Sequence, residues 1–249
     1  MLLKSIQVVL AFVIIIPALF ISMFVAILPS FIMRLFGLNK AADQWMYINA
    51  VNISKVILFS LGTKVITHNK ELIPPKGAPI CFVANHQSAV DIPVVAGFLQ
   101  VWAGFITKAE LKKIPIVSSW IKAIHCVYID RKSPRSSIEA ILQGVENIRS
   151  GIPMFIFPEG TRSKNGQVGE FKTGALKLAT RAKAIIVPIT IEGTRGAFED
   201  RKGKFSIQKI ILTVNNPIDT SILDEEGLKE LPTTVFNSIT HHLSSHSTL

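Results

Sequence analysis

The stretch ICFVANHQSAVD, residues 80–91, decides the fold class of this chain. Its first five residues form an uninterrupted apolar run, which is typical of a strand buried on both faces of a sheet. Polar residues follow at the end of that strand, among them His86 and Asp91. In open α/β sheets, functional groups collect at the carboxyl ends of the strands. The stretch therefore predicts a buried strand that delivers His86 and Asp91 to the functional edge of an α/β sheet.

Six further runs have β-type composition, and helical patterns separate several of them. These strands are expected at residues 64–67, 104–107, 127–130, 154–157, 185–191 and 207–214. A clear amphipathic helix is expected between Ser133, its cap, and Gly151, which stops it. Two more helices are expected over residues 172–183 and 232–246. This alternation predicts one α/β catalytic domain with a largely parallel or mixed sheet flanked by helices.

The apolar excess of the chain lies at its start. Hydrophobic residues make up 49% of the 249 residues, and no charged residue stands between Lys4 and Arg34. An uncharged helix of about 20 residues covers the hydrocarbon core of a bilayer. Pro17 leaves open whether this segment is straight, kinked or folded back as a hairpin with residues 45–61. The alternative is a buried core helix, but membrane attachment is the favoured interpretation.

Residues 45–61 are apolar with polar interruptions at Asn49, Asn52 and Lys55, which favours an interfacial amphipathic helix over a spanning one. We therefore expect residues 1–62 to form an N-terminal hydrophobic helical membrane-anchoring segment of two helices. Residues 63–249 are expected to form the catalytic domain.

The charge of the chain points to an anionic partner. Lys and Arg number 27 against 17 Asp and Glu, which gives a net charge of +10. No basic tract interleaved with aromatics and no helix-turn-helix or RNA-binding signature is present, so nucleic acid is not expected as a partner. With an apolar anchor on the same chain, a phospholipid surface is the better candidate. A generally basic solvated surface is the alternative.

Several enzyme classes are excluded by missing motifs. The chain has no G-x-S-x-G elbow, no H-E-x-x-H zinc helix, no phosphate-binding P-loop and no G-x-G-x-x-G after a strand. Two cysteines, Cys81 and Cys126, exclude a disulfide scaffold. We expect neither a metal site nor a bound cofactor.

His86 and Asp91 have the spacing of a general base and its orienting group. A carboxylate that binds one ring nitrogen of a histidine fixes the tautomer and stabilises the imidazolium. Asp91 can reach back to His86 if a tight turn separates them. The spacing alone is weak, because an isolated pair of this kind is more often structural.

A second group of polar residues follows the strand expected at 154–157. In the loop FPEGTRS, residues 157–163, Gly160 allows close backbone approach, and Thr161 and Ser163 add hydroxyl donors. Arg162 offers the planar donor fork that suits a phosphate monoester, and we expect Glu159 to orient it. An ordinary polar loop with an Arg–Glu pair is the alternative.

Together these residues resemble a known family. NHxxxxD at 85–91 and FPEGTRS at 157–163 are similar to the motifs of the glycerolipid acyltransferases, in particular the 1-acylglycerol-3-phosphate acyltransferases. KxELxxxP at 108–115, with IDR at 129–131, is similar to the family's middle motif. VPI at 187–189, with Gly193, is similar to its last. The chain departs from the middle motif at Ser118 and His125, where the family usually has glycine, and this leaves substrate preference open.

The resemblance implies transfer of a fatty acyl group from acyl-CoA or acyl carrier protein to the sn-2 hydroxyl of 1-acylglycerol-3-phosphate, giving phosphatidic acid. It implies His86 and Asp91 as the catalytic pair and a bacterial cell membrane location, with the catalytic domain on the cytoplasmic face. The residues expected to bind the substrate phosphate are Lys108, Glu159, Gly160, Thr161 and Arg162, with Asn85, Arg131 and Ser163 as further substrate contacts or structural support. The thioester is a co-substrate, and no cofactor is implied.

Two alternatives remain open. One is an acyltransferase for glycerol-3-phosphate or another lysophospholipid. The other is a non-catalytic membrane module that binds anionic lipid.

Overall fold

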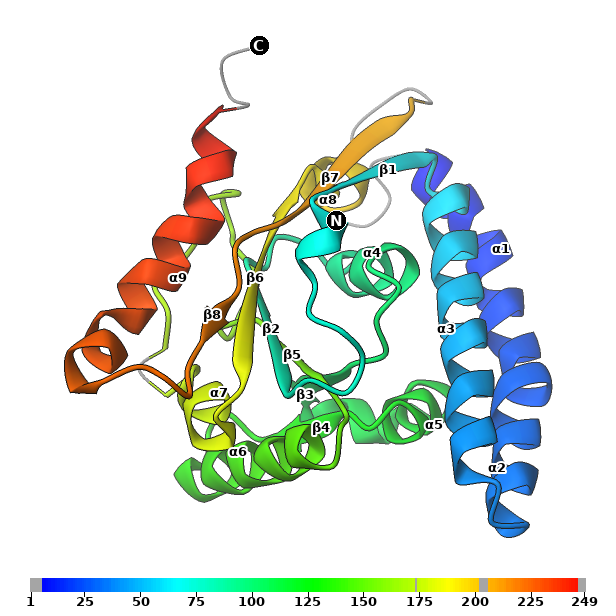
Figure 1. Cartoon of the computed structure of the whole chain (residues 1–249). Helices are drawn as coiled ribbons and strands as arrows, with labels where there is room; N and C mark the ends of the chain where they lie inside the picture. Colours follow the sequence, from blue (N-terminus) through cyan, green and yellow to red (C-terminus); the bar gives the residue numbers. More distant parts are fainter. Residues whose placement is uncertain (1–5, 173, 202–205, 246–249) are drawn as a thin grey trace.

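The computed structural model describes residues 6–172, 174–201 and 206–245. Its centre is one mixed sheet with the strand order β1-β7-β6-β2-β5-β3-β4, and β8 pairs with β6 (Figure 1). The strands are β1 (Thr63–His68), β2 (Ile80–Ala84), β3 (Gly104–Lys108), β4 (Val127–Ile129), β5 (Met154–Ile156), β6 (Ile185–Glu192), β7 (Gln208–Val214) and β8 (Ile218–Asp219).

Five strands of the sheet run in the same direction, which matters for the site. β2 pairs in parallel with β5 and β6, and β3 pairs in parallel with β5 and β4. β7 and β8 run antiparallel to β6, while β1 runs parallel to β7. The carboxyl ends of β2, β3, β4, β5 and β6 therefore meet at one edge of the sheet.

Helices cover both faces of the sheet (Figure 1). The helices after the N-terminal segment are α4 (Asp91–Phe98), α5 (Pro115–Ala123), α6 (Pro134–Arg149), α7 (Lys177–Ala182), α8 (Thr194–Ala197) and α9 (Glu225–Ser245), with short 3₁₀ turns at Lys70–Leu72 and Ala109–Lys113.

The side chains of β2 alternate between the two faces. Phe82 joins the core beneath α4 and the N-terminal helices, whereas Cys81 and Val83 join the core beneath α6, α7 and α9. All five residues of β2 are buried, which confirms the strand expected from the apolar run.

The N-terminal segment is a pair of antiparallel helices (Figure 1). The first runs without interruption through α1 (Ile6–Ser22), a π-helical turn (Met23–Ile27) and α2 (Leu28–Leu35), so Pro17 does not break it. A short turn then leads into α3 (Asn39–Ser60), which packs along both parts of the first helix. Of the three possibilities left open at Pro17, the structure has the hairpin, formed by the first helix and α3.

The first helix suits a lipid environment. The helix Ile6–Leu35 contains an 18-residue stretch with a mean hydropathy of 3.0, and it is the one helix in the described ranges that is long and apolar enough to cross a membrane. Large apolar side chains such as Ile6, Val13 and Phe31 are more than half exposed along it. The opposite stripe, with Val8, Ala11 and Ile15, belongs to the same core as Phe82 of the sheet. The helix pair and the sheet therefore share one hydrophobic core.

Two indole groups contact the π-helical turn and the residue before it. Trp45 of α3 donates its Nε1–H to the backbone carbonyl of Val25 at 3.0 Å. Trp120 of α5 donates to the hydroxyl of Ser22 at 2.9 Å. The turn is thus fixed from two other helices.

The expected helices differ from the observed ones mainly in their ends. α6 begins after Ser133, whose side chain accepts the backbone N–H of Ser136, as expected of a cap. The helix expected over 172–183 is shorter, because Lys172 donates its backbone N–H to Pro158 and the chain turns before Lys177. The C-terminal helix starts earlier than expected, at Glu225, and His246 lies outside the described residues. The two-residue strand β8 was not expected.

Candidate active site

His86 and Asp91 form a direct pair at the carboxyl end of β2. Nδ1 of His86 lies 2.7 Å from Oδ2 of Asp91. The Asp91 side chain is fully buried, and the His86 side chain is 15% exposed. The tight turn that the spacing required is present, so the two residues meet as expected.

The turn between them holds the carboxylate in place. Asp91 begins α4, and its Oδ2 also accepts the backbone N–H groups of Gln87 at 2.7 Å and Ser88 at 2.8 Å. The ring of Phe157 stacks on the imidazole at 4.1 Å between centroids. Because Nδ1 of His86 is hydrogen-bonded to the Asp91 carboxylate, Nε2 is the ring nitrogen that remains available to accept a proton from the substrate.

Glu159 links the two loops that carry the sequence motifs, residues 85–91 and 157–163. Its Oε1 accepts the backbone N–H of His86 and its Oε2 that of Gly169, each at 2.7 Å. Glu159 is only 3% exposed, and burial raises the pKa of its carboxyl group. The expectation that Glu159 orients Arg162 is therefore wrong, because both of its oxygens are taken up by backbone groups.

Arg162 has a different acidic partner. Its Nη1 donates to Oε1 of Glu199 at 2.9 Å, and half of its side chain is exposed. Thr161 is exposed beside it, and Gly160 has a φ of +66°, a conformation that glycine adopts without strain. Sequence spacing gave no signal for Glu199, which lies 37 residues after Arg162 and outside every motif.

Asn85 and Ser163 brace the loops. Asn85 is fully buried, and its amide exchanges two hydrogen bonds of 2.8 Å with the backbone of Ile191 in β6. Ser163 donates its backbone N–H to the carbonyl of His86 at 2.8 Å. We expect Asn85 and Ser163 either to contact the substrate or to support the structure, and these hydrogen bonds favour structural support for both residues.

Lys108 and Arg131 lie on the same edge of the sheet, farther along it. Lys108 ends β3, which is two strands away from β2, and Arg131 follows the end of β4. Two strand spacings amount to about 10 Å. Both side chains are exposed. The topology therefore brings these two cations to the edge that holds His86, without placing them in direct contact with it.

Comparisons with known proteins agree with this site. A family model described as "Acyltransferase" matches residues 64–192, which span the His86 turn and the Arg162 loop. The chain belongs to the acyltransferase family. It is 32% identical to the probable 1-acyl-sn-glycerol-3-phosphate acyltransferase of Mycoplasma pneumoniae over 82% of this chain and 85% of that protein. It is 29% identical to the 1-acyl-sn-glycerol-3-phosphate acyltransferase of Saccharomyces cerevisiae over 83% and 68% of the two chains.

A solved structure of the acyltransferase family is similar along the whole chain. The crystal structure of the 1-acyl-sn-glycerophosphate acyltransferase PlsC from Thermotoga maritima matches with a TM-score of 0.78 and 26% identity. The match covers 98% of this chain and 99% of that one. The similarity therefore includes the N-terminal helix pair as well as the sheet.

Within the acyltransferase family, His125 stands where the resemblance leads one to expect glycine, and the structure explains that preference. His125 has a φ of +57°, in the left-handed region that glycine adopts most easily. It precedes β4, at the opposite edge of the sheet from His86, and its Nε2 lies 3.0 Å from Oδ1 of Asp43 in α3. Ser118 pairs its hydroxyl with that of Tyr128 at 3.1 Å. His125 therefore does not lie beside His86.

Other side chains are poorly suited to act as an acyltransferase nucleophile. Burial raises the pKa of both Cys81 and Cys126 to about 12, so their thiols stay protonated at neutral pH. Ser88 is fully buried and donates its hydroxyl to Glu199 at 2.5 Å. The site offers a base rather than a covalent nucleophile.

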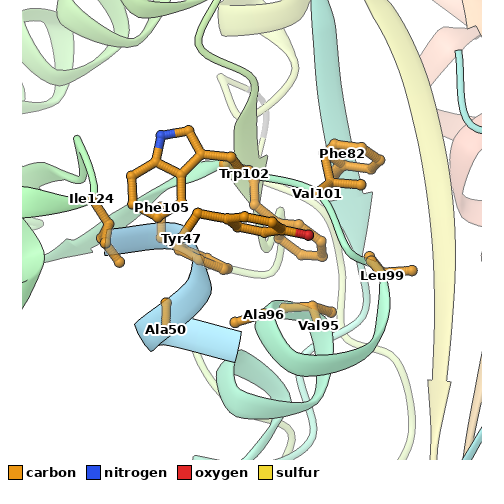
Figure 2. Close-up of a pocket in the computed structure, with 12 residues that line it drawn as sticks. Tyr47, Ala50, Phe82, Val95, Ala96, Leu99, Val101, Trp102, Phe105 and Ile124 are labelled. Carbon is orange, nitrogen blue, oxygen red and sulfur yellow. The ribbon is translucent and has the colours of Figure 1, made fainter. Parts of the chain in front are cut away.

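An apolar cavity of about 30 Å³ lies between the sheet and the helices α3 and α4. Figure 2 shows Tyr47 and Ala50 of α3, Val95 of α4, and Phe82 and Phe105 of the sheet around it. Phe82 lies on β2, four residues before His86. Apolar space is thus present behind the strand that carries the base.

Proposed function

We propose that this protein transfers a fatty acyl group from a thioester to the sn-2 hydroxyl of 1-acylglycerol-3-phosphate, giving phosphatidic acid. The single observation that supports the chemistry best is the 2.7 Å contact between His86 Nδ1 and buried Asp91, which leaves Nε2 for the substrate. The named relatives in bacteria and yeast, together with the Thermotoga maritima structure, support the choice of acceptor.

The reaction uses His86 as a general base. Nε2 removes the proton of the acceptor hydroxyl while the oxygen attacks the thioester carbonyl carbon. Asp91 stabilises the imidazolium that forms, as its carboxylate already accepts the Nδ1–H. The tetrahedral intermediate then breaks its carbon–sulfur bond, and the proton passes from Nε2 to the departing thiolate. An ester and a free thiol result, and no acyl-enzyme is formed.

The acceptor phosphate is expected to bind at Arg162. Its guanidinium is half exposed in the loop that the His86 carbonyl and Glu159 hold beside the base. A guanidinium binds two phosphate oxygens side by side, which fixes the acceptor as well as attracting it. Lys108 and Arg131, on the same edge, extend the positive field along the sheet.

The lipid nature of the substrates accords with the N-terminal helix. Residues Ile6–Leu35 expose apolar side chains along a helix of membrane-crossing length. We propose that this helix holds the protein in a bacterial cell membrane with the catalytic domain on the cytoplasmic face, where the donor, acyl-CoA or acyl carrier protein, is found.

An acceptor panel tests the proposal. The full-length protein in detergent is given labelled acyl-CoA or acyl carrier protein with lysophosphatidate, glycerol-3-phosphate, lysophosphatidylglycerol or monoacylglycerol. We expect the highest kcat/KM for lysophosphatidate. A higher value for glycerol-3-phosphate or lysophosphatidylglycerol would establish a different acceptor, and no turnover of any acceptor would contradict acyl transfer.

A further inference from the structure

Glu199 contacts both loops of the active site, although it belongs to no motif. Its Oε2 accepts the hydroxyl of Ser88 at 2.5 Å, and its Oε1 accepts the backbone N–H of Ala89 and Nη1 of Arg162, each at 2.9 Å. Ser88 and Ala89 lie in the turn between His86 and Asp91. Three donors from two loops therefore converge on one carboxylate.

The contact with Glu199 leaves most of the guanidinium available. It engages Nη1 of Arg162, while the remaining N–H donors have no protein partner among the residues that the structure describes. An arginine side chain that is half exposed loses much rotational freedom when it binds a ligand. A fixed hydrogen-bond partner on Nη1 reduces that loss of rotational freedom, because the guanidinium is already oriented before the ligand binds.

Glu199 is itself held from the N-terminal helix. Its neighbour Phe198 packs edge-on against Phe12 of α1, with ring centroids 6.3 Å apart. Arg201, two residues further on, is buried and donates to Oε1 of Gln7 in α1 at 2.5 Å and to the carbonyl of Leu61 at 2.7 Å. The segment therefore connects the helix pair directly to the loops around His86.

Glu199 also differs in kind from Glu159. Glu159 is buried and binds only backbone groups, so it supports the loops themselves. Glu199 is 22% exposed and forms the one ion pair of Arg162 within the described part of the chain. Glu199 therefore contacts the backbone and side chain of the His86 turn as well as Arg162, and the contact with Arg162 is the one that can act on the acceptor.

We propose that Glu199 is the positioning residue for acceptor binding: it fixes the guanidinium of Arg162 toward the phosphate of the lysolipid, and the N-terminal helix fixes Glu199. This rests on the proposed function, since it assigns the phosphate to Arg162. Glu199 touches no reacting atom and acts through Arg162.

The test is a double-mutant cycle on the full-length protein, with KM for lysophosphatidate and for the acyl donor measured separately. We expect Glu199→Ala to raise KM for lysophosphatidate about tenfold, the usual size of a lost charge-assisted hydrogen bond. KM for the donor should stay within about twofold and kcat within about threefold of wild type. In an Arg162→Ala background, Glu199→Ala should change KM by less than about twofold, because its target is gone.

Two further variants make the cycle decisive. Glu199→Gln keeps the shape and one acceptor oxygen, so its KM should lie between those of wild type and Glu199→Ala; the same cycle with this variant serves if Glu199→Ala does not fold. Glu139→Ala is the matched control, since Glu139 pairs with Arg135 on an exposed helix surface and should leave KM unchanged.

Three outcomes would overturn the proposal. A KM for lysophosphatidate that stays at the wild-type value in Glu199→Ala would show that Arg162 needs no partner. A KM below wild type in Glu199→Gln would show that the carboxylate competes with the phosphate for Arg162. An equal loss in the Arg162→Ala background would assign Glu199 a general structural role. If instead the wild-type protein shows no lysophosphatidate turnover, the proposed function itself fails, and this result is separate from the three above.

Discussion

Oε1 of Glu159 accepts the backbone N–H of His86 at 2.7 Å, across 73 residues of sequence. The bond joins the two motif loops at the residue that serves as the base. Glu159 therefore helps to hold the backbone of His86 in position.

Replacing the base is expected to remove acyl transfer without unfolding the protein. His86→Ala should lower kcat by about 10²- to 10⁴-fold, since a positioned general base contributes that much. Asp91→Asn should lose most activity too, because the imidazolium loses its carboxylate. Initial rates with lysophosphatidate and the melting temperature measure this. His68→Ala, at an exposed histidine at the end of β1, is the control. Retention of more than about a tenth of the wild-type rate in His86→Ala would rule out the general-base assignment.

Arg162→Ala should raise KM for the lysophospholipid far more than KM for the acyl donor, because the guanidinium is assigned to the acceptor phosphate. Arg162→Lys should restore only part of the loss, since an ammonium group lacks the planar fork. Lys108→Ala should act in the same direction. Steady-state kinetics with a monoacylglycerol as neutral acceptor provide the check: if turnover of this acceptor falls as much, Arg162 supports structure and does not bind phosphate.

Removing the Glu159 carboxylate should destabilise the site. Glu159→Ala leaves the N–H groups of His86 and Gly169 without an acceptor, at a cost of about 1–3 kcal/mol each when such a group stays buried. We expect a lower free energy of unfolding in denaturant together with a loss of kcat. The exposed Glu170 supplies a control, Glu170→Ala, which should behave as wild type.

The raised pKa of Glu159 predicts that the free energy of unfolding depends on pH. Burial raises the pKa of Glu159 in the folded protein above its ordinary value near 4.5. A group with a raised folded-state pKa adds stability that is complete below the unfolded pKa and is lost as the pH rises through the folded one. The free energy of unfolding of wild type, relative to Glu159→Gln, should therefore fall as the pH rises from about 4. A difference that does not change with pH would contradict the raised pKa.

Substitutions at position 125 should change the free energy of unfolding through the backbone conformation and should leave catalysis unchanged. At a φ of +57°, a β-branched residue is strongly disfavoured, so His125→Val should lower the free energy of unfolding by about 1–2 kcal/mol. His125→Gly removes the strain and also the contact with Asp43, and should stay close to wild type. Because His125 lies at the opposite edge of the sheet from His86, kcat/KM should stay within about twofold in both variants. A large loss of activity in His125→Gly, without loss of stability, would place this residue in the catalytic site instead.

The N-terminal helices should be required for folding as well as for membrane binding. Deleting residues 1–61 removes Val8, Ala11, Ile15 and Leu58 from the core that contains Phe82, so the remaining chain should aggregate. The intact protein should stay with membranes after a wash at about 1 M salt, where charge screening reaches about 3 Å but apolar burial is unaffected. Full-length protein in the soluble fraction without detergent would contradict the membrane assignment.

The strands could be predicted from sequence because they are short apolar runs between polar turns. The sheet is buried on both faces, so β2, β5 and β6 have little of the alternation that a surface strand shows. β8 escaped prediction because two residues, Ile218–Asp219, give no pattern. The expected start of α7 at Lys172 is wrong, because Lys172 donates its backbone N–H to the carbonyl of Pro158, a contact 14 residues back in the chain that local sequence does not reveal.

The contacts in the site also divide into those that local sequence predicts and those that it does not. His86 and Asp91 are five residues apart, so their pairing follows from one turn and was visible in the spacing. A spacing of three residues predicts that Glu159 orients Arg162, but the carboxylate of Glu159 accepts the backbone N–H groups of His86 and Gly169 instead. Glu199 is 37 residues from Arg162 in sequence and contacts it only in the folded chain, because α8 and the segment after it follow β6. Contacts of this kind have no local signal.

Indole groups from two later helices contact the π-helical turn at Met23–Ile27 and the residue before it. A polar group facing hydrocarbon costs several kcal/mol when it has no partner, and an indole N–H is no exception. Trp45 meets this demand by giving its N–H to the Val25 carbonyl, and Trp120 by giving its own to Ser22. The first helix is therefore contacted at this point by tryptophans that follow it in the chain. Because Trp45 and Trp120 follow this stretch in the chain, it gains these two contacts only after α3 and α5 have been synthesised and have packed against it.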